Sequence, residues 1–285
     1  MTSVHRMIGK HGIHPKKRLG QHFLHAAPTI KKIVNSLGIE KDDIVMEIGS
    51  GPGIMTGFVA QQARTVVAVE IDEDMIDVAR KEHAEHKNIE WIKSDILDVD
   101  PSTFASGRKR IKIIGNLPYN VSSQIVFWMI DNRAFISKAL IMVQKEVALR
   151  ICAMPGGRDY GILSVICQTF AQCKRLFDVS AGNFIPPPDV MSSMVMMDFE
   201  NPEYIVKNEK RFREIVKGAF GKRRKTIRNA LIGSNTLQIS LELLDETLSS
   251  LEISPSRRPE TLKVQEFIDL AEMIELSRQR KNPLL

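Results

Sequence analysis

The chain has 285 residues, of which 43% are hydrophobic and 26% charged, a composition typical of a soluble globular protein with one or two folding units. Lys and Arg outnumber Asp and Glu by 40 to 34, so the formal net charge is +6 and an anionic partner is indicated. The three cysteines form no Cys-x-x-Cys pair, and no apolar run approaches the roughly 18 residues of a membrane helix. These features disfavour a disulfide framework, a zinc ribbon and a membrane-inserted or exported protein, so a cytoplasmic location is expected.

Short apolar runs alternate with helical patterns from Asp43 onward, which indicates βα units and a mostly parallel, doubly wound sheet. The expected strands are 44–48, 66–71, 89–92, 111–114 and 139–143. The expected helices are 54–63, 73–83, 123–130, 146–153 and 163–170, and Asp72 is expected to cap the second. Two late strands, 175–179 and 193–199, are expected to form an antiparallel hairpin at the sheet edge.

Helical spacing of apolar residues replaces the strand pattern after Asn201-Pro202 and continues to the end of the chain. We therefore expect a basic N-terminal segment over 1–40, a catalytic domain over 41–201 and a small helical domain over 202–285. Residues 1–39 and 215–241 carry basic side chains and no acidic ones, which suits a phosphate backbone, although a solvated basic surface is the alternative for either stretch. The second stretch contains Lys222, Arg223, Arg224, Lys225 and Arg228.

The first expected strand ends in EIGSGPG, which places Gly49, Gly51 and Gly53 at a strand-to-helix junction. Glycines there let the backbone turn tightly and approach a ligand closely. Their spacing does not match the dinucleotide fingerprint, and no phosphate-binding lysine follows them, which argues against a P-loop. By itself such a loop is more often a simple turn than a nucleotide site.

Two carboxylates fall where the next two strands should end. Glu70 follows the glycines by about 20 residues, where an acid typically accepts ribose hydroxyls, and Asp95 could accept the amino group of an adenine ring. Helix capping is the alternative role for both acids. The ligand could be a dinucleotide or S-adenosylmethionine (SAM), and a ribose-binding Glu with an adenine-binding Asp fits SAM, whose sulfonium needs no phosphate cradle.

The fourth expected strand leads into Asn116-Leu117-Pro118-Tyr119. An adenine amino nitrogen is a poor nucleophile because its lone pair is delocalised into the ring, so a catalyst must orient and polarise it. The Asn116 side chain and the Leu117 carbonyl offer acceptors for the amino hydrogens, Pro118 stiffens the loop, and Tyr119 offers a face for an unstacked base. A plain turn is equally compatible with these four residues alone.

A second stiff loop, NFIPPPDVMSS, precedes the last expected strand and carries Phe184. Its aromatic ring could be the other side of a clamp on a base, although a lone phenylalanine is more typical of a core.

The motifs of this chain closely resemble those of the ribosomal RNA adenine dimethyltransferases of the KsgA type. They are RLGQHFL, EIGSGPG, VEID, SD, GNLPYN, QKEVALR, YGILSV, FIPPPDVMSS and FGKRRKTIRNAL, and they cover nearly the whole chain. The resemblance implies a Rossmann-like SAM-dependent methyltransferase fold with a small α-helical C-terminal domain. The activity that it implies is dimethylation of the amino groups of two adjacent adenosines near the 3′ end of small-subunit (16S) rRNA, with a role in small-subunit biogenesis and the immature small ribosomal subunit as partner.

The resemblance also implies roles for matching residues. The expected SAM contacts are His22, Leu24, Gly49, Gly51, Glu70, Asp95 and Asn116. Asn116 is also expected to contact the target adenine, Tyr119 and Phe184 to clamp it, and the basic residues at 222–228 to dock on RNA. His22 departs from most bacterial members, which carry Asn there, and matches other branches of the family.

Three other functions remain open on the sequence. A macrolide-resistance methyltransferase of large-subunit rRNA shares the fold and chemistry, a DNA adenine methyltransferase would need a separate target-recognition domain, and a small-subunit assembly factor could bind without catalysis.

Five of the seven histidines lie at positions 5, 11, 14, 22 and 25 with no accompanying cysteine or carboxylate, so no metal is expected. A monomer is expected because coiled-coil heptads are absent.

Overall fold

The computed structural model describes residues 7, 9–12, 15–16, 20–105, 109–222, 224–234, 237 and 239–281. The chain divides into two compact units, the first made of Met1–Ala148 with Ala171–Asn201 and the second of Leu149–Phe170 with Pro202–Leu285. None of the described helices is long and apolar enough to cross a membrane.

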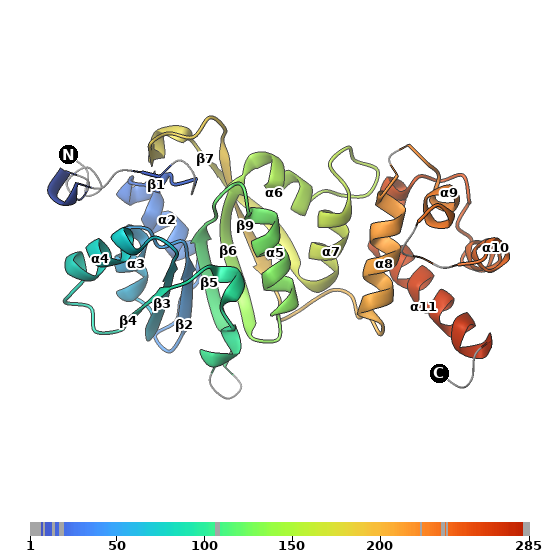
Figure 1. Cartoon of the computed structure of the whole chain (residues 1–285), viewed down its shortest axis with the longest axis horizontal. Coiled ribbons are helices and arrows are strands. Elements are labelled where there is room, and N and C mark those ends of the chain that lie inside the picture. Colours follow the sequence, from blue (N-terminus) through green and yellow to red (C-terminus); the bar gives the residue numbers. More distant parts are fainter. Residues whose placement is uncertain are drawn as a thin grey trace. The chain divides into compact units, whose positions relative to one another are not determined.

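A seven-stranded sheet forms the centre of the first unit (Figure 1), in the order β4-β3-β2-β5-β6-β9-β7. The strands from β4 to β6 are parallel, whereas β9 runs antiparallel to both β6 and β7. The strand bounds are β2 Ile44–Ile48, β3 Thr65–Glu70, β4 Ile89–Lys93, β5 Ile111–Asn116, β6 Ile136–Gln144, β7 Gln172–Val179 and β9 Ser192–Asp198. The predicted mostly parallel α/β class is confirmed, and the two late strands pair antiparallel as predicted.

Helices lie before, between and after the parallel strands. α2 (Ala27–Leu37) precedes β2, α3 (Ile54–Ala60) joins β2 to β3, α4 (Glu73–Glu82) joins β3 to β4, and α5 (Ser122–Asp131) joins β5 to β6. α6 (Lys145–Ile151) follows β6 and contains the boundary between the two units. α2 and α3 bury their apolar faces in one cluster with side chains of β2, β3, β5 and β6. As predicted, Asp72 caps α4, because its side chain accepts a hydrogen bond from the Asp74 backbone N–H. Because β2 to β5 are parallel, their carboxyl ends lie at one edge of the sheet.

A small second sheet ties the N-terminal segment to the late loop. β1 (Phe23–Leu24) pairs antiparallel with β8 (Phe184–Ile185), so that Leu24 lies opposite Phe184. Two residues are too few to show the alternating hydrophobic pattern of a strand, so this pairing could not be predicted from the sequence. The pairing brings residues 20–24 to the carboxyl edge of the main sheet.

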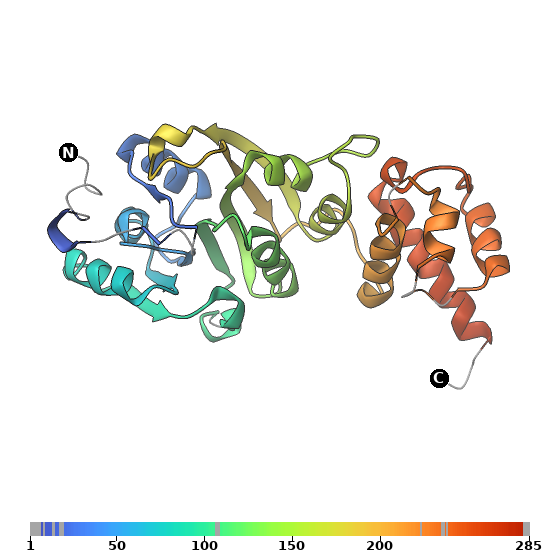
Figure 2. The same ribbon diagram turned by 45° about the horizontal axis from the view of Figure 1, so that its top comes forward.

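The second unit consists of helices (Figure 2), with bounds α7 Ile162–Phe170, α8 Glu209–Phe220, α9 Ile227–Ile232, α10 Leu241–Ser250 and α11 Val264–Lys281. Its core contains two aromatic contacts, Phe170 edge-on to Phe212 at 6.1 Å and Phe220 beside Phe267 at 5.7 Å between ring centroids. The expected catalytic segment 41–201 includes 149–170, which instead belongs with the helices after 202. The reason is that Phe170 at the end of α7 packs on α8. This contact joins residues that are distant in the sequence, so sequence patterns could not predict it.

Candidate functional site

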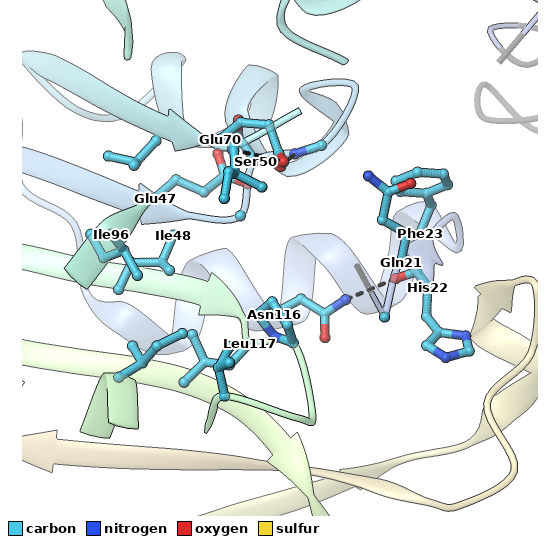
Figure 3. A pocket seen from close by; sticks show the side chains of 18 of the residues that line it. Gln21, His22, Phe23, Glu47, Ile48, Ser50, Glu70, Ile96, Asn116 and Leu117 are labelled. Atoms are coloured by element: carbon cyan, nitrogen blue, oxygen red, sulfur yellow. Dashed lines mark hydrogen bonds between the residues drawn. The ribbon is translucent and has the colours of Figure 1, made fainter. Parts of the chain in front are cut away.

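A cavity of about 220 Å³ opens at the carboxyl ends of β2 to β5 (Figure 3). Parallel sheets commonly bind ligands at this edge. Such a site lies where the loops after two adjacent strands run to opposite faces of the sheet and leave a crevice between them. Most of the predicted site residues line the cavity, namely His22, Leu24, Gly49, Gly51, Glu70, Asp95, Asn116, Leu117, Pro118 and Tyr119. The structure therefore gathers residues from the N-terminal segment and from four successive strand ends into one place.

The glycine loop and Glu70 are joined by hydrogen bonds. Glu70 is 7% exposed, and its carboxylate accepts from the backbone N–H groups of Gly51 at 2.8 Å, Asp72 at 2.9 Å and Ile71 at 3.0 Å. Burial raises the pKa of Glu70, and the three backbone donors offset part of that rise. Gly51 has φ 53° and lies against the Phe23 ring, which a Cβ would approach to 3.2 Å, so a side chain there would be both strained and crowded.

Asp95 has the capping role considered for it, and it also lies at the cavity. It lines the cavity, and its Oδ1 atom also accepts from the Leu97 backbone N–H at 3.0 Å, which caps a short turn. An exposed carboxylate has further acceptor positions, so the cap leaves Asp95 able to accept from a ligand.

Asn116 at the end of β5 is oriented by the N-terminal segment. Its Nδ2 atom donates to the His22 backbone carbonyl at 2.9 Å, the contact drawn in Figure 3. Because a carbonyl only accepts, this bond assigns the amide nitrogen to His22 and leaves Oδ1 as an acceptor at the cavity. Leu117 is held as well, since its N–H donates to the Met142 carbonyl at 3.0 Å.

Tyr119 lies beside His22 at the cavity. The two rings are stacked with centroids 5.7 Å apart and planes 24° apart. The Tyr119 hydroxyl is hydrogen-bonded to Ser192 at 2.7 Å, and burial raises the pKa of Tyr119. His22 Nδ1 lies 2.8 Å from the Pro186 carbonyl, so this nitrogen carries the hydrogen. The Tyr119 ring is thus held by the first residue of β9, and the His22 ring by the loop that follows β8.

Phe184 does not line the cavity. Its side chain is 2% exposed and packs in the same apolar cluster as α2 and α3. The structure therefore does not bring Phe184 face to face with Tyr119, as a clamp would require. The physical reason is the β1–β8 pairing, which places Phe184 opposite Leu24, itself 7% exposed, with both side chains in the core.

Glu47 is a cavity residue that the sequence interpretation did not single out. It is 1% exposed, lines the cavity and has an Oε2 atom with no hydrogen-bond partner among the described residues. Burial, with the neighbouring Glu70 carboxylate as a further cause, raises the pKa of Glu47 to about 8. Its position immediately before the glycine loop was the available signal. A buried carboxyl of this kind is suited to a cationic ligand group.

The N-terminal segment is held over the cavity by Asp72. Lys16 Nζ contacts Asp72 Oδ1 and Asp74 Oδ2, each at 2.7 Å, and Gln21 Nε2 donates to Asp72 Oδ2 at 3.0 Å. The Asp72 side chain is 2% exposed, so this ion pair is better shielded from solvent than an ordinary surface pair. The Asp72 backbone N–H also donates to the Glu70 carboxylate. Residues 70–72 therefore connect the N-terminal segment to Glu70 in the cavity.

The basic residues predicted to bind RNA belong to the second unit. Lys222, Arg224 and Lys225 are exposed, and Arg223 lies outside the described residues. Arg228 instead forms a two-bond ion pair with Asp245, at 2.6 and 2.8 Å. Arg228 therefore has a partner within the helical unit, which the sequence pattern did not reveal.

The comparisons with known proteins agree with this geometry. The model of the family described as ribosomal RNA adenine dimethylase matches residues 13–275. The ribosomal RNA small subunit methyltransferase A of Syntrophus aciditrophicus is 40% identical over 280 residues, which are 97% of this chain and 100% of that relative. The protein of the same name from Desulforapulum autotrophicum is 40% identical, with 96% of this chain and 97% of the relative covered.

Two solved structures share the fold. A dimethyladenosine transferase from Plasmodium falciparum superimposes with a TM-score of 0.77 at 23% identity, covering 91% of this chain and 98% of that one. The 23S rRNA methyltransferase ErmE superimposes with a TM-score of 0.68 at 22% identity, covering 89% and 99%. At these identities the likeness concerns the fold.

Proposed function

Because the chain belongs to the ribosomal RNA adenine dimethylase family, we propose that it transfers methyl groups from SAM to adenine amino groups of small-subunit rRNA. The observation that carries the proposal is the orientation of Asn116, whose amide oxygen is left as an acceptor at the cavity by the bond from Nδ2 to His22. The relatives named as small-subunit enzymes, which match over nearly the full length, support the choice of ribosomal subunit.

The residues of the cavity fit SAM. Glu70 and Asp95 would accept hydrogen bonds from the ribose and the adenine, and the glycine loop allows close approach of the ligand. Oε2 of buried Glu47, which has no hydrogen-bond partner in the described part of the chain, fits a cationic group, and SAM carries both a sulfonium and an ammonium. Bound SAM would supply a methyl group on a positively charged sulfur, which is a good leaving group.

The chain's own contribution to the reaction is orientation of the target amine. The Asn116 Oδ1 atom and the Leu117 carbonyl would accept the two amino hydrogens, so that the nitrogen lone pair points toward the methyl carbon. Tyr119 would support the face of the unstacked adenine. The role of Phe184 as the opposite face stays a prediction, which its side chain can fulfil only by leaving the core.

The finer features of the reaction are also part of the proposal. The enzyme would dimethylate two adjacent adenosines near the 3′ end of 16S rRNA, acting in the cytoplasm as a monomer on the immature small subunit. The purified protein is incubated with labelled SAM in two parallel reactions, one with small and one with large ribosomal subunits, to test which subunit is the substrate. Label in the small subunit is expected. Label confined to the large subunit would instead indicate a resistance-type methyltransferase, and tight binding without label would indicate an assembly factor.

Glu47 makes SAM binding depend on pH. Its pKa is about 8, so near neutral pH the carboxyl is protonated before SAM binds. A bound cation lowers that pKa, so binding releases a proton, and SAM affinity should rise as the pH increases toward 8 and level off above it. SAM affinity measured by calorimetry from about pH 6 to about pH 9 checks this. The Glu47→Gln variant should show a flatter profile, and an identical profile in both proteins would contradict the role of Glu47.

The exposed residues Arg224 and Lys225 are expected to contact RNA phosphates. Changing both to Ala should reduce the slope of log affinity against log salt by roughly 1.5, because each lost phosphate contact removes about 0.7–0.9. A matched control is Lys207→Ala with Lys210→Ala, which removes the same charge elsewhere in the second unit. Equal slopes for the two double variants would mean that residues 224 and 225 form only a solvated surface.

A further inference from the structure

Two histidines and a glutamate meet on the turn that follows α4. His83, Glu85 and His86 each offer one ligand atom, and these atoms all lie within 4.8 Å of one another. The Nε2 atom of His86 is 3.7 Å from Oε1 of Glu85, and the His83 and His86 ring centroids are 5.9 Å apart. In the part of the chain that the structure describes, this is the one place where three potential metal ligands come this close.

The His83 ring is fixed by packing. A Cβ at Gly53 would lie 2.9 Å from its Cδ2 atom, and a Cβ at Gly57 would lie 2.7 Å from its Cε1 atom, so the ring fills the space that these two glycines leave open. The Trp91 ring lies beside it, with centroids 6.2 Å apart. His83 Nε2 is buried and has no hydrogen-bond partner among the described residues. A residue held this firmly loses little conformational freedom when it binds a ligand.

The other two residues retain the freedom to adjust. The Glu85 side chain is 67% exposed and that of His86 is 23% exposed. Tetrahedral coordination with bonds of about 2.0–2.1 Å needs ligand atoms about 3.4 Å apart, so these two side chains must move inward by roughly 1 Å. Rotation about their side-chain bonds provides movements of this size without displacing the backbone.

Imidazole nitrogen and carboxylate oxygen are ligands that zinc and neighbouring divalent transition metals accept. The three residues also border a second cavity of about 750 Å³, separate from the one at the strand ends except for the shared wall residue Ile54. A metal held by three side chains there keeps a coordination position for water on the cavity side. We propose that His83, Glu85 and His86 bind a divalent transition-metal ion, with zinc as the best match.

This metal does not take part in methyl transfer. Its anchor, His83, packs against Gly53 of the glycine loop and Gly57 of α3, and none of the three ligand residues lines the cavity that Glu70 and Asn116 line. The bound ion would hold the turn at 83–86 against α3, which stabilises the first unit. The earlier expectation of no metal was argued from the five histidines at positions 5 to 25, whereas His83 and His86 are the remaining two.

Metal binding by the full-length protein tests the proposal independently of methyltransferase activity. The protein is treated with a chelator, dialysed, and titrated with Zn²⁺ by calorimetry and with Co²⁺ by visible absorption. The Glu85→Gln variant changes an exposed side chain and the His86→Gln variant a partly exposed one, and both should fold normally. Each should weaken Zn²⁺ binding at least about tenfold and reduce the Co²⁺ absorption. The His11→Gln control removes an imidazole that pairs with Glu82, outside the cluster, and should bind Zn²⁺ as the unchanged protein does.

Zinc should also raise the melting temperature of the unchanged protein more than that of the Glu85→Gln/His86→Gln double variant, because binding to the folded state alone stabilises it. The proposal is overturned if the unchanged protein binds Zn²⁺ no more tightly than about 1 mM, or if the double variant binds it with the same affinity.

Discussion

Asn116→Ala is expected to reduce turnover at saturating SAM by on the order of a hundredfold or more, while SAM still binds. The substitution removes the acceptor that orients the target amine, which is a contact comparable to one donor of an oxyanion hole. Single-turnover methylation of small ribosomal subunits, with SAM binding measured separately by calorimetry, gives both quantities. Near-normal turnover of a variant that binds SAM would rule out this role for Asn116.

A matched control for this variant is Asn88→Ala. The Asn88 side-chain amide also holds backbone carbonyls, those of Ala60 at 2.9 Å and Ala63 at 3.1 Å, but it lies outside the cavity. Its loss should lower the melting temperature and leave turnover nearly unchanged. A turnover loss of equal size in both variants would mean that Asn116 acts through stability.

Glu70→Ala is expected to weaken SAM binding by on the order of a hundredfold, since hydrogen bonds to charged groups contribute about 1.5–3 kcal/mol and each 1.4 kcal/mol is tenfold. The substitution removes the expected ribose acceptor. It also leaves the N–H groups of Gly51, Ile71 and Asp72 without their acceptor, so the glycine loop loses its support. Calorimetric titration with SAM measures the effect.

The control for Glu70 is Glu73→Gln on the first turn of α4. Glu73 pairs with Lys93 on the surface and does not line the cavity, so SAM affinity should stay the same. Circular dichroism must show that Glu70→Ala is folded. A folded Glu70→Ala protein that binds SAM as tightly as the Glu73→Gln protein would remove Glu70 from the cofactor site.

Much of the first unit could be predicted from the sequence because local patterns determine it. The apolar run at 44–48 is β2 itself, and Glu70 closes β3 as expected. Parallel strands place their carboxyl ends at one edge of the sheet, so acidic residues at those ends were expected to lie close together there. The same reasoning located Asn116 at the end of β5.

The parts that could not be predicted depend on contacts between distant residues. The bond from Asn116 to the His22 carbonyl joins positions 94 apart, and the contact of Lys16 with Asp72 joins positions 56 apart. Burial of Phe184 follows from a pairing of two-residue strands, and α7 joins the second unit because Phe170 packs on Phe212. No local period or motif encodes such contacts, since their partners are chosen by tertiary packing.

The most direct test of the proposed activity is to map the methylated nucleotides. Small subunits from cells that lack this methylation are incubated with the protein and labelled SAM, and the rRNA is then digested and analysed by mass spectrometry. We expect dimethyladenosine at two adjacent adenines near the 3′ end of the small-subunit rRNA. Absence of methylated adenine from that rRNA, in a preparation that binds SAM, would contradict it.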